Sequence, residues 1–170
     1  QGLLFQQTLK NSVHASEISG ITGNNGIFNI APSDIKGDMG FRKYENFTLS
    51  KGDIANLIFK YGKENVSQFV NLVDNTININ GLVNTVRDGK FYNGNAIFIS
   101  PNGMIVGESG VLNVGSLSVY TPNQASYNSY IKNNYTGDIS KLEQGNANVT
   151  INGKVISNSD INILAKDAVI

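Results

Sequence analysis

The shortness of the apolar runs is the feature of this sequence that most limits its fold. Between Ala96 and Pro122, three such runs follow one another, with breaks at residues 101–103 and 107–110. The Pro, Asn and Gly residues at these breaks favour turns, and the runs between them are too short for typical helices. A chain built in this way is expected to consist of short strands joined by tight corners.

Side-chain alternation within the first of these runs supports this interpretation. Ile97 and Ile99 should point to one face of a strand and Phe98 to the other, because successive side chains of a strand alternate. A second strand is expected at residues 104–106 and a third at residues 111–119.

Asparagine and glycine are unusually frequent, with 25 Asn and 18 Gly in 170 residues. Both residues tolerate left-handed backbone and close tight turns. Only three Pro are present, which argues against a disordered Pro-rich linker. This composition indicates a folded chain that turns often.

Further strands are expected elsewhere in the chain. Residues 52–61 fit either one face of a helix or a strand. Residues 40–49, with aromatic side chains at mixed spacings, are interpreted as one strand with a bend. Strands are also expected at residues 26–32 and 69–73 and within residues 77–83, which contain an Asn-Gly turn at Asn80-Gly81.

An imperfect repeat is the main evidence on architecture. The segment INGLV (79–83) returns as INGKV (151–155), and NGMIV (102–106) is a looser copy. Apolar runs with a period near 20 favour an all-β solenoid, in which each coil buries its face on the next. A stack of antiparallel hairpins is the alternative, because Asn-Gly is also the strongest hairpin signal.

Residues 120–146 interrupt this pattern. They are polar and rich in Tyr, and we expect them to form an excursion on the surface. Residues 149–170 then resume the pattern and stop within it. We therefore expect residues 1–170 to be a single domain and a piece of a longer protein.

Composition excludes several classes of function. Lys plus Arg and Asp plus Glu number 13 each, so no cationic field favours nucleic acid or an anionic membrane as a partner. Cysteine is absent, which removes disulfides and thiol chemistry. The sequence contains no apolar stretch of the roughly 20 residues that cross a membrane as a helix. It contains no signal peptide either, and we expect that one has been removed.

Candidate catalytic residues are lacking. His14 is the only histidine, and its polar neighbours suggest a surface position. No P-loop, zinc-protease or serine-hydrolase motif occurs. We therefore expect no catalytic, cofactor-binding or metal-binding site. The open alternative is a polysaccharide-cleaving enzyme with a hidden carboxylate pair among Asp34, Asp38, Asp53, Asp74 and Asp88.

The segment AIFISPNGMIVGESGVLNVGSLSVYTP resembles a signature of two-partner secretion domains, the haemagglutination activity domains of filamentous-haemagglutinin-like exoproteins. In that family a strand leads into Asn-Pro-Asn-Gly-Ile. Pro101, Asn102 and Gly103 match this motif, whereas Ser100 replaces Asn and Met104 replaces Ile. Pro101 would fix φ, and Gly103 would supply a conformation that a Cβ obstructs.

Two further segments extend the resemblance, which covers roughly residues 20–122. Tyr44 and Phe47 match the aromatic positions of one family segment. In the other, a strand that contains Asn71 leads to a corner at Asn80 and Gly81. The family's Asn-Pro-Asn-Leu signature is absent, which suggests the lineage of the high-molecular-weight adhesins.

The resemblance implies a right-handed parallel β-helix with an N-terminal cap and small extra-helical β elements. It also implies a monomeric, cofactor-free secretion domain at the N-terminus of a long exoprotein of a Gram-negative bacterium. Its partner would be an outer-membrane TpsB-type transporter, whose periplasmic POTRA domains recognise it. The exoprotein would pass through the periplasm to the cell surface or the medium.

The motif at residues 100–104 has two interpretations: a structural corner, which we favour, or a surface that the transporter recognises. A different function is also open, in which the domain itself binds host cells or glycans. The part of the exoprotein beyond residue 170 would decide whether it is an adhesin that contacts host surfaces, a cytolysin or a growth-inhibition toxin.

Overall fold

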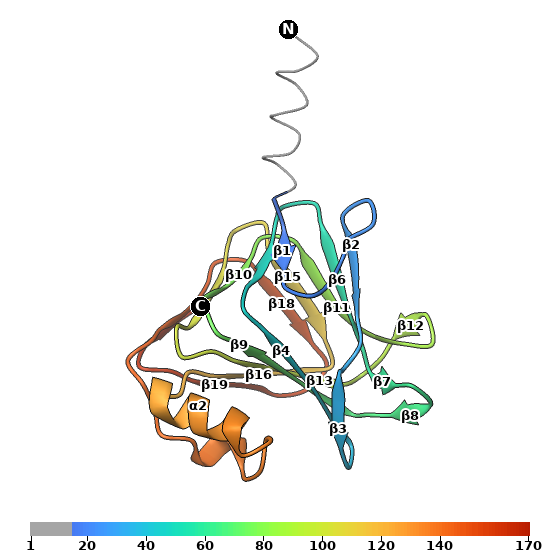
Figure 1. Cartoon of the computed structure of the whole chain (residues 1–170). Helices are drawn as coiled ribbons and strands as arrows, with labels where there is room; N and C mark the ends of the chain where they lie inside the picture. The colour runs from blue at the N-terminus through green and yellow to red at the C-terminus, as the bar shows by residue number, and fades with distance from the viewer. Residues whose placement is uncertain (1–14) are drawn as a thin grey trace, which may run out of the picture.

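A computed structural model describes residues 15–170, and the fold of this range is mostly β with parallel sheets (Figure 1). His14, the expected surface histidine, lies outside the described residues. Three six-stranded sheets, here called A, B and C, account for most of the strands between residues 15 and 170.

Each sheet draws its strands from the whole length of the described chain. In spatial order, sheet A contains β1 (Glu17–Ile18), β5 (Phe47–Leu49), β10 (Ile77–Ile79), β14 (Met104–Val106), β17 (Val149–Ile151) and β20 (Ala168–Val169). Sheet B contains β18 (Lys154–Ser157), β15 (Val111–Val114), β11 (Leu82–Arg87), β6 (Ile54–Ile58) and β2 (Ile27–Ile30), with β12 (Lys90–Phe91) paired to β11. Sheet C contains β19 (Ile161–Leu164), β16 (Ser116–Tyr120), β13 (Asn95–Ile99), β9 (Gln68–Val73), β4 (Met39–Tyr44) and β3 (Asp34–Lys36).

From β4 onward the chain visits sheets C, A and B in turn, and one such passage is called a round below. Strands of successive rounds pair in parallel in all three sheets. The described antiparallel strand pairs, isolated bridges apart, involve β1 and three hairpins: β3–β4, β11–β12, and β7 (Lys60–Tyr61) with β8 (Glu64–Asn65). The alternative of stacked antiparallel hairpins is therefore wrong, because a hairpin turn joins antiparallel neighbours whereas Asn80-Gly81 joins strands of different sheets.

The length of a round differs from the expected period. Asn95 pairs with Ser116 and Val149 with Ala168, which are separations of 21 and 19 positions. Rounds that carry a hairpin are longer; Gln68, for example, pairs with Asn95, 27 positions later. The period near 20 is thus the length of a bare round, and inserted hairpins obscure it in the sequence.

The repeat is only partly as expected. The segments 79–83 and 151–155 occupy equivalent positions, because each begins with a residue that pairs with Val106. The segment 102–106 ends at Val106 and is therefore not equivalent to them. Its resemblance to the other two copies comes from turn chemistry alone.

The structure shows which secondary structure two other segments form. Residues 40–49 are not one bent strand, because β4 and β5 belong to different sheets and a corner separates them. Residues 52–61, left open between helix and strand, contain β6 and β7. In β6, Ala55 and Leu57 are buried and their neighbours are half-buried, as alternation in a strand requires.

The three sheets surround an apolar core and form the sides of a triangle in Figure 1. In-register residues of successive rounds stack there. For example, Phe47, Ile77, Met104 and Val149 lie beside one another in sheet A and are at most 1% exposed.

The alternation expected in β13 is confirmed by two separate clusters. Phe98 belongs to the core inside the sheets, whereas Ile97 and Ile99 belong to a second cluster on the outer side of sheet C.

The expected excursion contains helix α2 (Gln124–Lys132) and a short 3-10 helix (Ile139–Lys141). Helix α2 lies against the outer side of sheet C (Figure 1), where Tyr127 and Tyr130 pack on the second cluster. The ring of Tyr135 stacks on that of Phe41, with centroids 4.7 Å apart. The excursion therefore gives sheet C a buried outer face.

A ladder of asparagines, the Asn ladder, runs across the outer face of sheet B. Asn29, Asn56, Asn84 and Asn113 are in register. The Nδ2 of each of the last three donates to the Oδ1 of the preceding member at 3.1 Å. Stacked amides of this kind link successive parallel strands outside the core.

Removal of a central member of the Asn ladder should cost more than removal of its terminal member. Asn84→Ala loses two side-chain hydrogen bonds and should lower the free energy of unfolding by about 1–3 kcal/mol. Asn29→Ala loses one and should cost about 0.5–1.5 kcal/mol. Urea unfolding of both variants measures the difference, and equal losses would show that the second hydrogen bond of Asn84 contributes nothing.

Candidate functional site

Residues 100–104, here called the signature turn, join β13 of sheet C to β14 of sheet A. Ser100 is 1% exposed and closes the turn from inside. Its Oγ donates to the carbonyl of Asn75 at 2.8 Å and accepts from the backbone N–H of Asn102 at 3.1 Å. Ser100 therefore ties this turn to the equivalent corner of the preceding round.

Asn102 forms the outer part of the same turn. Its side chain is exposed, and its Nδ2 donates to the carbonyl of Asp74 at 2.8 Å. This is the bond to a neighbouring round that a structural role requires. Exposure lowers the cost of losing that bond and leaves the rest of the amide accessible to a partner.

Gly103 has the left-handed backbone conformation that the sequence predicted for the turn. Its φ is +85°, and a Cβ built on it would lie 2.2 Å from the carbonyl oxygen of Asn148. Met104 follows directly and is 1% exposed, paired with Ile77 on one side and Val149 on the other. Residues 100–104 thus form a corner pressed between the preceding and following rounds.

Three of the residues expected to support the motif, Tyr44, Phe47 and Asn71, meet inside the core. The Tyr44 hydroxyl donates to Oδ1 of Asn71 at 2.6 Å, and the Asn71 Nδ2 donates to the carbonyls of Phe69 and Ile97, each at 3.2 Å. Asn71 is 0% exposed, and none of its side-chain polar atoms lacks a partner.

Aromatic packing links this hydrogen-bonded pair to the strand before the signature turn. The rings of Tyr44 and Phe47 meet edge-on at 5.2 Å, and Phe47 meets Phe98 at 5.7 Å. Their burial gives Tyr44, Phe47 and Asn71 a structural role.

Asn80 and Gly81 lie at a different corner, between sheets A and B. The carbonyl of Asn80 accepts from Ser109 Oγ at 2.7 Å. A Cβ on Gly81 would lie 2.3 Å from the carbonyl oxygen of Asp53. Gly81 is therefore required by close approach of two rounds, and the structure does not bring this pair to residues 100–104.

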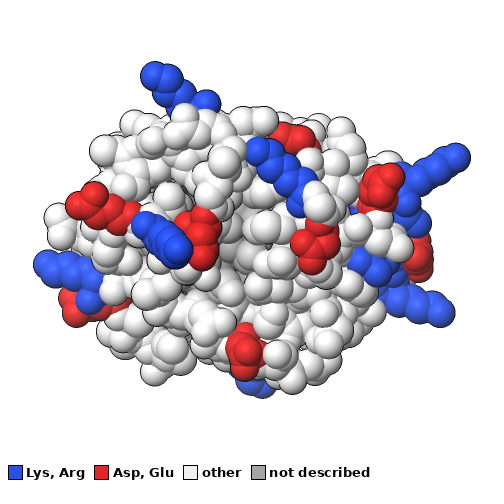
Figure 2. Space-filling model, turned by 90° about the horizontal axis from the view of Figure 1, so that it is seen from below, with Lys and Arg blue, Asp and Glu red and all other residues white. Residues whose placement is uncertain are grey.

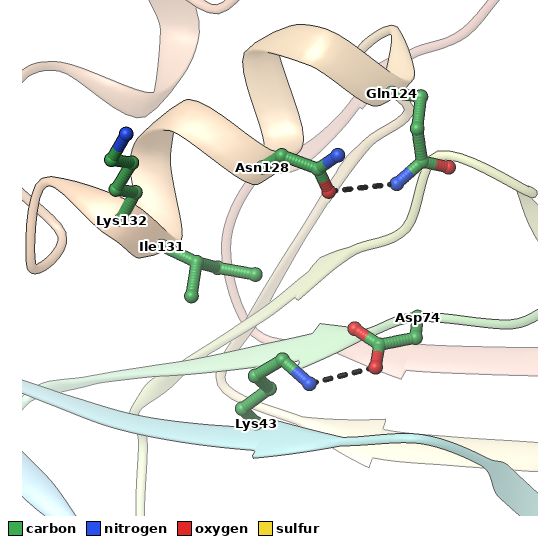
Figure 3. A pocket seen from close by; sticks show the side chains of 6 residues that line it. All are labelled: Lys43, Asp74, Gln124, Asn128, Ile131 and Lys132. Atoms are coloured by element: carbon green, nitrogen blue, oxygen red, sulfur yellow. Dashed lines mark hydrogen bonds and ion pairs between the residues drawn. The ribbon is translucent and has the colours of Figure 1, made fainter.

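A polar groove opens between α2 and the ends of β4 and β9 (Figure 3). Lys43 and Asp74 form an ion pair on the sheet side, with Nζ and Oδ2 2.7 Å apart. The other Asp74 oxygen accepts from the Tyr127 hydroxyl at 2.9 Å. The groove has a volume of about 490 Å³ and is lined by Lys43, Asp74, Gln124, Asn128, Ile131 and Lys132.

The helix side of this groove was not anticipated from the sequence. Gln124, Asn128 and Lys132 recur every four positions and so share one helix face. Asn123 caps the helix by accepting from the Ser126 N–H at 2.8 Å. An Asn N-cap followed by that spacing was the available signal, hidden by the polar composition of the segment.

Charges elsewhere are sparse and mixed. On the face shown in Figure 2, basic and acidic side chains alternate between broad uncharged areas. Within residues 15–170, no group of three or more His, Asp or Glu side chains is placed to hold a metal ion. No helix in the same range is long and apolar enough to cross a membrane.

Several buried tyrosines have altered acidity. Burial raises the pKa of Tyr44 far above its ordinary value of 10.0. Burial, together with the hydrogen bond to Asp74, also raises the pKa of Tyr127, and burial raises that of Tyr130 to about 12. These phenols are held neutral by packing, which favours a structural role.

Comparisons with known proteins add no identification: no protein-family model matches the chain, and no curated protein matches it.

Gly103→Ala should destabilise the domain more than Gly52→Ala. The two glycines have similar φ values of +85° and +88°, but a Cβ at Gly52 would have no neighbour within 4 Å. Gly52→Ala should therefore cost about 1 kcal/mol from backbone strain alone. Gly103→Ala adds a clash with a backbone carbonyl and should cost at least about 2 kcal/mol. Urea unfolding measures both, and equal costs would refute the tight corner.

The free energy of unfolding should fall at alkaline pH, because the folded state keeps the Tyr44 hydroxyl protonated. Above about pH 10 the unfolded chain releases this proton, so the free energy of unfolding falls by up to about 1.4 kcal/mol per pH unit. Tyr44→Phe should reduce this slope. At neutral pH it should also cost about 1–3 kcal/mol, because Asn71 loses a buried donor.

Urea unfolding at neutral pH and at about pH 11 measures both effects. Tyr61→Phe, at a tyrosine 37% exposed, is the control at neutral pH. An unchanged slope in Tyr44→Phe would contradict the linkage.

Proposed function

We propose that the described chain is a right-handed parallel β-helix in which each round is one coil. The regular visits to sheets C, A and B and the parallel pairing of successive rounds support this architecture. Strand β1, which runs antiparallel to β5 at the edge of sheet A, belongs to the N-terminal cap. The hairpins β3–β4, β7–β8 and β11–β12 are the extra-helical elements.

We further propose that this domain targets a large exoprotein for two-partner secretion. POTRA domains of an outer-membrane transporter would recognise it, and its coils would then nucleate folding outside the cell. The observation that carries the proposal is the signature turn: residues 100–104, the segment that resembles the family, form a tight corner between coils with an exposed tip at Asn102.

The energetics of stacking suit such a role. Each coil pairs with the preceding one through backbone hydrogen bonds and buried apolar rows, so folding can proceed one coil at a time as the chain emerges. No nucleotide is needed for this step. The free energy of stacking itself would oppose backward movement of the chain.

A binding experiment tests the proposal directly. The domain should be retained by the purified POTRA region of the transporter from the same bacterium, and co-expression with that transporter should release it into the medium. A scrambled-sequence domain and an unrelated transporter are the controls. Absence of binding, together with equal release when the transporter is missing, would reject the proposal.

Asn102→Ala separates the two roles of the turn. If the amide acts as a cap, the variant should lose about 0.5–1.5 kcal/mol of stability and secretion should fall in proportion. We expect this outcome because Asn102 bonds the preceding coil. Thermal melting of the purified variant and its secreted yield are the two measurements.

Asn75→Ala is the matched control. Asn75 is exposed at the equivalent corner of the preceding coil, and its Nδ2 donates to Asn46 Oδ1 at 2.9 Å. A similar loss in both variants supports the structural role. If Asn102→Ala melts like the wild type but is not secreted, while Asn75→Ala is secreted normally, the turn is a recognition surface.

A further inference from the structure

We propose that Asn25-Gly26 is a site of spontaneous deamidation, at which the folded domain converts a side-chain amide into a carboxylate without an enzyme. The site is independent of the proposed secretion function. Asn-Gly is a favourable sequence for this reaction, because the glycine has no side chain to obstruct attack by its own nitrogen. The chain contains five such pairs, which begin at Asn25, Asn80, Asn93, Asn102 and Asn152.

The reaction is an intramolecular substitution. The backbone nitrogen of Gly26 attacks Cγ of the Asn25 side chain and forms a new C–N bond. The nitrogen loses its proton, the Cγ–Nδ2 bond breaks, and the leaving amide nitrogen takes up a proton and departs as ammonia. Water then opens the five-membered succinimide at either carbonyl, which leaves aspartate or isoaspartate.

Residues 24–27 form a two-residue hairpin turn in the loop that leads into β2 (Figure 1). The Asn24 N–H donates to the carbonyl of Ile27 at 2.9 Å, and the Ile27 N–H donates back at 3.0 Å. Asn25 and Gly26 have φ values of +52° and +79°, as in a type I′ turn. The peptide group between them has no hydrogen-bond partner within residues 15–170.

Rotation of this one peptide group brings the reacting atoms together. Closure of the ring requires Cβ of Asn25 and N of Gly26 to be eclipsed about the Cα–C bond, which in an L-residue occurs at ψ of about −120°. This is the ψ of the first central residue of a type II′ turn. A flip of the central peptide converts type I′ into type II′ and keeps both hairpin bonds.

The flipped turn is a minor state. A side chain is disfavoured at the first central position of type II′, where glycine is preferred. The crowding of Cβ against the next nitrogen that causes this preference is also the approach that the reaction needs. Gly26 accepts the accompanying change of its own φ because it has no Cβ. Asn25 can therefore react without unfolding of any strand.

Two of the other pairs hold the equivalent peptide group by a hydrogen bond. The carbonyl of Asn80 accepts from Ser109 Oγ at 2.7 Å. The N–H of Gly94, which follows Asn93, donates to the carbonyl of Tyr92 at 2.8 Å. Each of these bonds must break before the peptide group can rotate.

The pairs at Asn102 and Asn152 are held against neighbouring rounds. The Asn102 amide is bonded to the preceding round, and the Gly103 N–H donates within the signature turn at 3.3 Å. The residues on both sides of Gly153 donate their N–H groups to the preceding round. Gly153 itself lies so close to that round that a Cβ on it would collide with the Gly110 carbonyl oxygen.

Asp88-Gly89 provides an internal comparison with the same kind of turn. Its φ values are +52° and +76°, and it joins β11 to β12. A carboxylate is a poorer electrophile than an amide, and Asp88 is also paired with Lys60, with Oδ1 and Nζ 3.0 Å apart. This turn therefore has the geometry of the reactive site without its leaving group.

The product would alter the end of sheet B. A new negative charge appears in the hairpin that leads into β2, the end strand of that sheet. Isoaspartate also adds a methylene to the backbone. The Gly26 carbonyl accepts from the Ile54 N–H at 2.8 Å, so the longer backbone disturbs the start of the pairing between β2 and β6.

Peptide mapping by mass spectrometry, after incubation of the purified domain at mildly alkaline pH, tests the proposal. Asn25 should convert at least about tenfold faster than each of the other four asparagines, because they react only after local opening. Asp88 should remain unchanged over the same time. Asn25→Gly should abolish the early release of ammonia and keep the turn, since Gly-Gly also forms type I′.

Urea below the unfolding transition distinguishes reaction in the folded turn from reaction after local unfolding. The rate at Asn25 should not change, because the flip exposes no buried surface, whereas the rates at Asn80 and Asn102 should rise. Absence of conversion at Asn25, conversion at the rate of the other pairs, a rate at Asn25 that rises with urea, or undiminished ammonia release from Asn25→Gly would each overturn the proposal.

Discussion

Parallel, in-register pairing between successive rounds is the constraint on which the rest of this structure depends. Adjacent strands lie about 4.8 Å apart, so each side chain meets the side chain at the same position of the next round. Inside the sheets this requires apolar residues that stack, as Phe47 and Ile77 do. On the outer face of sheet B the same spacing lets asparagines such as Asn56 and Asn84 bond in a ladder. At some corners, such as those of Gly81 and Gly103, it brings backbones so close that only glycine fits between them.

The signature turn joins this structural constraint to the proposed function. Ser100, Gly103 and Met104 face neighbouring rounds and are determined by packing. Asn102 is different, since it is bonded on one side and exposed on the other. A turn that the fold requires can in this way also present a fixed shape to the proposed transporter. The groove beside α2 shares Asp74 with the turn, so a shift of this residue would reach both.

Local patterns predicted most of the strands, but they missed the corners within residues 40–49 and 111–119, each of which was expected to be one strand. The opposite orientations of Ile97 and Phe98 followed from alternation alone, and the tight corner at Gly103 from its turn chemistry. The Asn ladder could not be foreseen, because an asparagine within a strand and one in a turn look alike until the register is known. The helix side of the groove was missed since Tyr127 and Tyr130 become apolar-facing only when sheet C lies beneath them.

The three corners of the triangle differ in how much extra chain they accept. From β5 onward, every connection from sheet A to sheet B is two or four residues long. Connections from B to C carry the hairpins, and one connection from C to A carries the 28-residue segment between β16 and β17. Insertions and deletions during evolution are therefore expected to accumulate at two corners and to be eliminated at the third. The corner between sheets A and B thus holds successive strands in register, whereas the other two corners can accept additional surface segments.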